Sequence, residues 1–236
     1  MNFRLKVNLV LVGTALLVMV PGGWYVNKIM REQASQDVIK QANMLMEGAL
    51  ATRSYTTDLV KPQLDPMLVD KFLPQTVPAF AATETFDRFR KKFANFKYKE
   101  AVLDPTNPRD LADKLETEII SRFVADPSLK EVSGESFRHF DRLYYVARPI
   151  QIKNPACLVC HDTPDRAPQT MRTVYGDKGG FGWKADQIVG AQIIVVPAYE
   201  QDNSTTAILK VIAAVSTGFL LMMMLVVNLL IRPKNR

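Results

Sequence analysis

Two long apolar runs lie near the ends of the chain, and a segment of mixed polar and apolar positions separates them. The first run extends from Val7 to Val26, and the second extends from Val211 to Ile231 without a charged residue. At about 1.5 Å per residue, a helix of about 20 apolar residues crosses a hydrocarbon core of about 30 Å. The sequence therefore predicts two transmembrane helices, within residues 1–26 and 206–236.

The basic residues next to both runs predict the orientation of the chain. They lie on the side of the chain ends: Arg4 and Lys6 before the first run, and Arg232, Lys234 and Arg236 after the second. Cytoplasmic flanks carry such an excess of basic residues, so we expect residues 27–205 on the periplasmic side of the cytoplasmic (inner) membrane. The first run also resembles a signal peptide. It is long, however, and Pro21–Trp24 offers no small-residue cleavage site, so we expect it to be retained.

The segment between the runs begins with a helical pattern. Apolar residues recur at helical spacing over Val38, Ala42, Leu45 and Ala49, and Met46 and Leu50 widen the stripe. This period predicts a long amphipathic helix that continues from the first span and ends at Lys61–Pro62. Phenylalanines at helical spacing predict a helix over residues 79–93, and a further helix is expected over residues 109–124.

Four later stretches alternate in the manner of strands. They cover residues 96–103, 135–140, 142–149 and 188–196, and the second and third flank Asp141 as in a hairpin. Antiparallel strands with helices on one side define an α+β fold. For a domain between two membrane helices we expect a PAS-like antiparallel sheet with flanking helices, an assignment that rests on analogy.

Composition and charge indicate whether the chain binds nucleic acid or membrane lipid. The 236 residues carry 30 Lys+Arg against 24 Asp+Glu, a formal net charge of +6. Five of these basic residues flank the apolar runs, and the others are interspersed with acids, so we expect no nucleic-acid partner. Membrane lipid is the partner that the two runs predict.

The candidate chemistry is concentrated at Cys157-Leu158-Val159-Cys160-His161, which holds both cysteines and one of the two histidines of the chain. Two thiols at this spacing reach the two vinyl groups of one porphyrin, and the adjacent imidazole is placed to ligate the iron. The pattern predicts one covalently attached haem c. Thioether attachment also suits a periplasmic location.

Three other interpretations of these cysteines are less favoured. A disulfide between Cys157 and Cys160 closes a very small loop and stabilises little. A thiol-disulfide oxidoreductase needs its Cys-x-x-Cys at the start of a helix within a βαβ pattern, and the sequence indicates neither. Zinc needs four ligands, which here would include the distant His139 and the poorly placed neighbours Cys160 and His161.

The segment between the runs resembles the single-haem c-type sensor domains with a PAS-like fold, formerly a domain of unknown function and often the extracytoplasmic part of HAMP-linked histidine kinases. The stretches that carry the resemblance are Ala51–Thr56, Phe72–Phe80, Asn107–Asp110, Ala147–Pro149, Cys157–His161, Gly180–Lys184 and Val189–Gln192. The resemblance implies that Cys157 and Cys160 anchor the haem and that His161 is the proximal ligand.

The resemblance leaves the other haem contacts open. Arg53, Tyr55 and Arg148 either line the pocket and neutralise haem propionates or have structural roles. Some family members use a distal cysteine, but both cysteines of this chain are needed for the thioethers. The candidates for the distal ligand are then Met46 first and Met44 second, with His139, Met171 and an empty sixth position as alternatives.

These features predict a membrane-anchored monohaem protein that acts in redox or diatomic-gas sensing. The chain ends shortly after Ile231, so a signal would pass to a partner chain. The alternatives are an electron-transfer haem subunit docked on a membrane complex and, less favoured, the thiol-disulfide oxidoreductase. We expect no enzymatic activity, because no paired acid and base or phosphate loop is apparent. A homodimer through the membrane helices is a possible assembly.

Overall fold

The computed structural model describes residues 2–138, 141–197 and 199–231. His139 and the basic residues of the C-terminal tail lie outside the described residues, so the structure does not bear on the predictions made for them. The chain divides into two compact units, one formed by Met1–Asp37 with Ala198–Arg236 and the other by Val38–Pro197.

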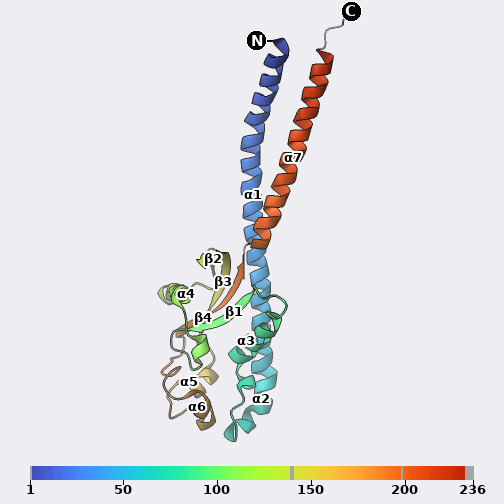
Figure 1. The fold of residues 1–236 in the computed structure, drawn as a ribbon. Coiled ribbons are helices and arrows are strands. Elements are labelled where there is room, and N and C mark those ends of the chain that lie inside the picture. Colours follow the sequence, from blue (N-terminus) through green and yellow to red (C-terminus); the bar gives the residue numbers. More distant parts are fainter. Residues whose placement is uncertain (1, 139–140, 198, 232–236) are drawn as a thin grey trace, which may run out of the picture. The chain divides into compact units, whose positions relative to one another are not determined.

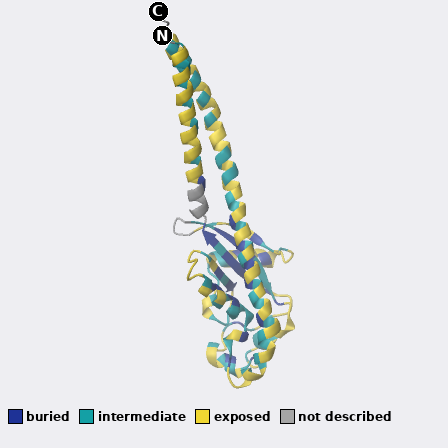
Figure 2. Cartoon of the chain, turned by 90° about the vertical axis from the view of Figure 1, so that its right-hand side faces the viewer, coloured by how far each residue is buried: buried dark blue, intermediate teal, exposed yellow. Residues whose placement is uncertain are grey.

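The first unit contains the two apolar runs as parts of long helices. Helix α1 (Phe3–Tyr55) includes the first run, with Pro21 inside it, and helix α7 (Tyr199–Leu230) includes the second. Their most apolar windows have mean hydropathies of 1.9 and 2.2, and no residue of either window is buried. Figure 2 shows the exposed and intermediate surface along these helices. Both helices are therefore long and apolar enough to cross a membrane.

Polar side chains join the two helices of this unit near the chain ends. The Asn228 amide donates to Asn8 Oδ1 at 2.9 Å, and Asn8 donates in return to Asn228 Oδ1 at 3.4 Å. Arg4 Nη2 also donates to the Ile231 carbonyl at 3.2 Å. These bonds join polar groups of one helix to polar groups of the other, and they hold the two helices in an antiparallel pair.

The second unit is built on one antiparallel sheet (Figure 1). Its strands are β1 (Lys97–Val102), β2 (Val132–Arg138), β3 (Asp141–Gln151) and β4 (Ile188–Pro197), in the order β1-β4-β3-β2. Every neighbouring pair is antiparallel, and β2 and β3 form the predicted hairpin, in which Arg138 pairs with Asp141. The α+β class predicted from the sequence is confirmed.

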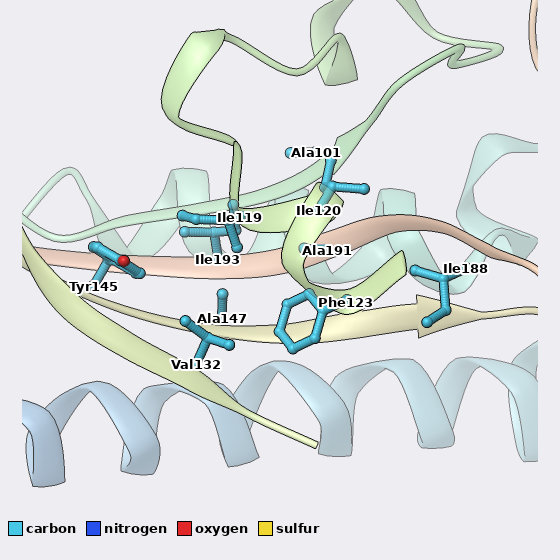
Figure 3. Close-up of a cluster of buried hydrophobic side chains, with 10 residues drawn as sticks. All are labelled: Ala101, Ile119, Ile120, Phe123, Val132, Tyr145, Ala147, Ile188, Ala191 and Ile193. Carbon is cyan, nitrogen blue, oxygen red and sulfur yellow. The ribbon is translucent and has the colours of Figure 1, made fainter. Parts of the chain in front are cut away.

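Helix α4 (Lys114–Ala125) covers one face of the sheet (Figure 3). Asp113 and Glu116 begin this helix with a capping box, in which each side chain accepts from the other residue's backbone N–H. Ile119, Ile120 and Phe123 then pack on inward-facing strand residues, which are Ala101, Val132, Tyr145, Ala147, Ile188, Ala191 and Ile193. This cluster is the larger core of the unit.

Helix α1 lies along the opposite face of the sheet. Its buried residues are Val38, Ala42, Met46 and Ala49, close to the predicted stripe. Strand residues that alternate with the α4-facing set, including Tyr144, Val146, Ile194 and Val196, are buried on this second face. The sheet thus has helices on both faces, and the prediction of helices on one side was wrong. Periodicity identified the apolar stripes but not the face that each one covers.

The remaining helical segments differ from the prediction at three boundaries, one of which is the end of α3 (Pro78–Phe89), four residues before the predicted end. The helical path does not end at Lys61–Pro62: a π-helical turn (Thr56–Val60), α2 (Lys61–Leu64) and a 3₁₀ turn (Asp65–Val69) extend it. Pro62 is tolerated because it lies in the first turn of α2, where its missing N–H costs little. Helix α4 starts later than expected, since Pro108–Asp110 forms a separate 3₁₀ turn.

The other short elements follow the predicted segments or lie around the cysteine motif. Helix α3 (Pro78–Phe89) corresponds to the predicted phenylalanine-rich helix. The others are a 3₁₀ turn at Pro74–Thr76, a 3₁₀ turn at Pro155–Cys157, α5 (Leu158–His161) and α6 (Gln169–Tyr175).

Candidate functional site

The Cys-x-x-Cys-His motif forms a single tight helical segment. Asn154 accepts a hydrogen bond from the backbone N–H of Ala156 at 2.9 Å and so starts the 3₁₀ turn that ends at Cys157. Helix α5 follows at once and ends at His161. Both cysteines are unpaired and half-buried. The local fold therefore presents two thiols and one imidazole within five residues.

A backbone carbonyl fixes the orientation of the imidazole. His161 Nδ1 lies 2.7 Å from the carbonyl oxygen of Gly180, while the Thr106 hydroxyl lies 3.4 Å from the same nitrogen. A carbonyl oxygen only accepts, so Nδ1 carries the proton in this bond and Nε2 keeps its lone pair. Metal-ligating histidines are held in this way, with one ring nitrogen donating to an outer acceptor and the other free to ligate.

The loop Gly180–Trp183 builds the support around His161. The indole of Trp183 stacks on the imidazole, with ring centroids 3.9 Å apart and an interplanar angle of 11°. The backbone N–H of Trp183 donates to the His161 carbonyl at 3.1 Å, and the backbone N–H of Gly182 donates to the Asp162 carbonyl at 2.7 Å. Stacking on one side and hydrogen bonds along the backbone therefore restrict the ring.

Gly180 is a glycine for steric and conformational reasons. Its φ is +81°, in the left-handed region, and a Cβ at this position would clash with the side chain of Thr106. Its N–H donates to Asp104 Oδ2 at 3.2 Å. The carbonyl that holds His161 is thus itself held by the loop around Asp104 and Thr106.

Burial sets the protonation of the three motif side chains. It lowers the pKa of His161, although the bond to Gly180 acts in the opposite direction, so the imidazole is neutral and able to ligate at neutral pH. Burial raises the pKa of the Cys157 and Cys160 thiols, and nearby positive charge on Arg53 and Lys61 offsets only part of that effect. Catalytic thiols usually have a lowered pKa instead.

An apolar wall lies beside the second cysteine. Phe72, Ala167 and Met171 are buried together, and they pack against partly buried residues that include Cys160, Tyr175 and Phe181. The ring of Phe72 meets that of Tyr175 edge to face, with centroids 5.7 Å apart. Helix α6 is fixed here by the Thr170 hydroxyl, which donates to the Leu68 carbonyl at 2.7 Å. This cluster can contact one side of a large apolar cofactor.

A buried polar network lies on the α1 side. Arg53, near the end of α1, forms an ion pair with Glu100 of β1, and Glu100 is only 2% exposed. Glu100 also accepts a hydrogen bond from the Tyr98 hydroxyl at 2.6 Å. Burial lowers the pKa of Arg53, but the charge of Glu100 and the bond to it outweigh that effect and raise the pKa overall. Arg53 is thus held by Glu100.

The other predicted site residues have varied surroundings. Met46 is fully buried in the α1 stripe, whereas Met44 is 68% exposed and Tyr55 is 59% exposed. Met171 is buried in the cluster that contacts Cys160. Arg148 lies on β3, where it pairs with α1 and with a residue close to β2, and the described contacts do not join it to the motif. These placements leave the predicted roles untested.

The structure bears on the alternatives for the cysteines. Among the described residues, no group of three or more His, Cys, Asp or Glu side chains could hold a metal ion. The zinc interpretation also needs His139, which lies outside these residues, so the structure does not test it. A short helix does start directly after Cys157, so the prediction that no helix begins at the motif was wrong. That helix has four residues, and the sheet lacks the parallel pairing of a βαβ unit.

Sequence reasoning gave no role to two residues that the structure places against His161. The Gly180 carbonyl accepts a hydrogen bond from His161, and Trp183 stacks on the imidazole, although both residues belong to a stretch that carried the family resemblance. The glycines in Gly180-Phe181-Gly182 signal a loop with special backbone conformation, but they do not indicate which side chain that loop contacts.

The fold and this site define an α+β domain that carries two free thiols and a hydrogen-bonded imidazole, and the same chain has two helices long and apolar enough to span a membrane. The model of the Tll0287-like family matches residues 31–197, and the chain therefore belongs to this family. The crystal structure of the cyanobacterial heme-protein Tll0287 superposes with a TM-score of 0.52 at 15% identity. The match covers 67% of this chain and 94% of that one, and shows a shared fold. No curated protein matches the chain.

Proposed function

We propose that this chain is a membrane-anchored monohaem c-type cytochrome domain that acts in redox or diatomic-gas sensing through a partner chain. In this proposal Cys157 and Cys160 would hold one haem through thioether bonds, and His161 would ligate its iron through Nε2. The observation that carries the proposal is the bond from His161 Nδ1 to the Gly180 carbonyl at 2.7 Å, which leaves Nε2 available beside the two thiols.

The fit of the residues to haem rests on the chemistry of the donor set. The motif supplies two thiols for covalent attachment, one neutral imidazole and an apolar wall around Cys160. The structural neighbour is a heme-protein, which agrees with this choice of cofactor. A bound haem supplies one-electron redox chemistry and, where an axial position is open, binding of small gases.

The location and fold subclass are part of the same proposal. Two apolar helices and the basic residues around them support an inner-membrane protein with its α+β unit in the periplasm. The four-stranded antiparallel sheet, with β4 and β3 at its centre, supports a PAS-like assignment. The raised pKa of both thiols argues against a thiol-disulfide oxidoreductase. We propose that the chain is not an enzyme.

The sixth iron position separates a sensor from an electron carrier. Met46 and Met171 are both buried, at 0% and 3% exposure, and a thioether from either one would favour electron transfer by closing the position. Met44, the other methionine candidate on α1, has a side chain that is 68% exposed. Met46→Ala, Met44→Ala and Met171→Ala variants test these assignments through the spectrum of the reduced protein.

The test of the proposal is expression of the full chain with a working cytochrome c maturation system. We expect the mass of one haem on the purified chain, its loss in a Cys157→Ser, Cys160→Ser double variant, and a Soret shift when carbon monoxide is added to the reduced protein. A chain that stays colourless beside a control cytochrome overturns haem binding. A coloured chain whose Soret band does not shift with carbon monoxide, but which a soluble cytochrome oxidises quickly, supports the electron carrier instead.

A further inference from the structure

One face of the helical path that leads from α1 to Leu68 is turned toward the cysteine motif. Half-buried residues recur on this path at helical spacing, and we call them the Lys61 face: Arg53, Thr57, Lys61, Asp65 and Leu68. Residues on the outer side of the path, including Tyr55 and Leu59, are exposed. Leu68 and Cys160 pack against the same buried cluster, and the Leu68 carbonyl accepts a hydrogen bond from Thr170 of α6. The Lys61 face therefore meets the region of the thiols.

The charges of this face act on both thiols. Burial raises the pKa of Cys157 and of Cys160, and the charge of Lys61 opposes the rise at both positions. Asp65 adds to the rise at Cys160. The pKa of His161, in contrast, is set by burial and by the bond to the Gly180 carbonyl. The cation of Lys61 is thus placed on the cysteine side of the motif, away from the contacts that hold the imidazole.

Lys61 supplies this face with an accessible N–H donor. Its Nζ lies 2.7 Å from Oδ1 and 3.0 Å from Oδ2 of Asp65. An ammonium group has three N–H donors, so these two contacts leave at least one for another acceptor. The Thr57 hydroxyl, in contrast, already donates to the Arg53 carbonyl at 2.9 Å. The Lys61 side chain is 32% exposed, so a small ligand can reach it from solvent.

We propose that the Lys61 ammonium donates a hydrogen bond to a small ligand at the sixth iron position and so favours ligands with negative charge on the outer atom. This inference rests on the proposed function, because it takes haem as the cofactor. A haem joined to both cysteines, with His161 on one side, would have the Lys61 face on its other side. Charge-assisted hydrogen bonds are about twice as strong as neutral ones, so the selected class is small anions and diatomic gases that become partly negative on iron.

The experiment compares Lys61→Met, Lys61→Arg and the control Lys40→Met in the full chain. Lys40 is exposed and lies further towards the start of α1, so the control removes one positive charge from the same helix. The readouts are the haem mass, the C–O stretching band of the carbon monoxide adduct in the infrared spectrum, and the azide affinity of the oxidised protein from a Soret titration. Thermal unfolding followed by circular dichroism reports any general structural damage.

We expect Lys61→Met to retain haem and to move the C–O band to higher wavenumber, because a positive charge near the ligand oxygen is lost. Its azide affinity should fall about tenfold, which corresponds to the loss of one hydrogen bond to a charged group. Lys61→Arg should keep most of the azide affinity, and Lys40→Met should change neither readout.

An unchanged C–O band and azide affinity in Lys61→Met overturn the inference, and so do equal changes in Lys40→Met. A wild-type haem protein that binds neither carbon monoxide nor azide also overturns it, because the sixth position is then closed. If Lys61→Met does not fold, Lys61→Gln decides through the same two readouts. A wild-type chain without haem refutes the proposed function itself.

Discussion

The buried carboxyl of Asp110 provides a quantitative test of the structure. Asp110 ends the 3₁₀ turn Pro108–Asp110, its side chain is 19% exposed, and Oδ1 lies 3.5 Å from Nε of Arg109. Burial raises the pKa of this carboxyl from 3.8 to about 6, and the charge of Arg109 opposes the increase only in part. The folded protein therefore holds the Asp110 proton more tightly than the unfolded chain does.

The sign and size of the effect follow from proton linkage. Because the pKa is raised in the folded state, the stabilising contribution of protonated Asp110 is full below about pH 4 and is lost as the pH rises through about 6. A shift of about two units corresponds to about 3 kcal/mol of unfolding free energy as an upper value. We expect Asp110→Asn, which stays neutral, to gain up to about 3 kcal/mol relative to wild type between about pH 4 and pH 7.

The assay is urea unfolding of both proteins in non-ionic detergent across this pH range, followed by circular dichroism. Asp126→Asn is the control with opposite sign. Hydrogen bonds from Ser128 lower the pKa of Asp126, so its contribution is present at neutral pH and is lost as the pH falls through its folded pKa. A free-energy difference between Asp110→Asn and wild type that does not grow with pH refutes the burial argument.

Three further substitutions test other parts of the structure by thermal or urea unfolding. Arg53→Met leaves Glu100 buried without its cation and should cost about 3–5 kcal/mol, and adding Glu100→Gln should recover part of the loss; additive effects would contradict the pairing. Phe123→Ala empties a fully buried position under α4 and should cost about 3–5 kcal/mol; a cost below about 1 kcal/mol contradicts this core. Gly180→Ala should lower the free energy of unfolding by at least about 1 kcal/mol, because φ is +81° and the Thr106 side chain leaves no room for a Cβ. The same substitution should reduce haem retention. An unchanged unfolding free energy and unchanged haem retention would contradict the geometry at His161.

Much of the fold was predictable because burial leaves a local periodic signal. The alternation over residues 188–196 corresponds to β4, where alternate residues face α4 and α1. The stripe that includes Val38 and Met46 was also predicted, since every third or fourth residue of α1 faces the sheet. Local patterns do not specify which face of the sheet a helix covers, and this explains the wrong prediction that helices lie on one side.

The site was predictable only where its chemistry is contiguous in sequence. Cys157, Cys160 and His161 stand together, so their spacing alone suggested thioether attachment and ligation. The acceptor for His161 lies 19 residues away, at Gly180. Nothing local to a glycine indicates which imidazole its carbonyl accepts a hydrogen bond from. Long-range acceptors are properties of the folded chain.

The attachment of α1 to the sheet sets a physical condition for sensing. Glu100, Gln192 and Arg148 lie opposite one another on adjacent strands, and they form a polar row across the face that α1 covers. Helix α1 contacts this row through Arg53 at one end, and through Asn43 and Glu47 at the other. Two described connections join the region of the thiols to α1. One is the pair of Arg53 and Glu100, and the other is the helical path Thr56–Val69, whose Leu68 carbonyl accepts a hydrogen bond from Thr170 beside the Cys160 cluster. A sensor requires at least one of these connections to differ between its two states, whereas an electron carrier has no such requirement.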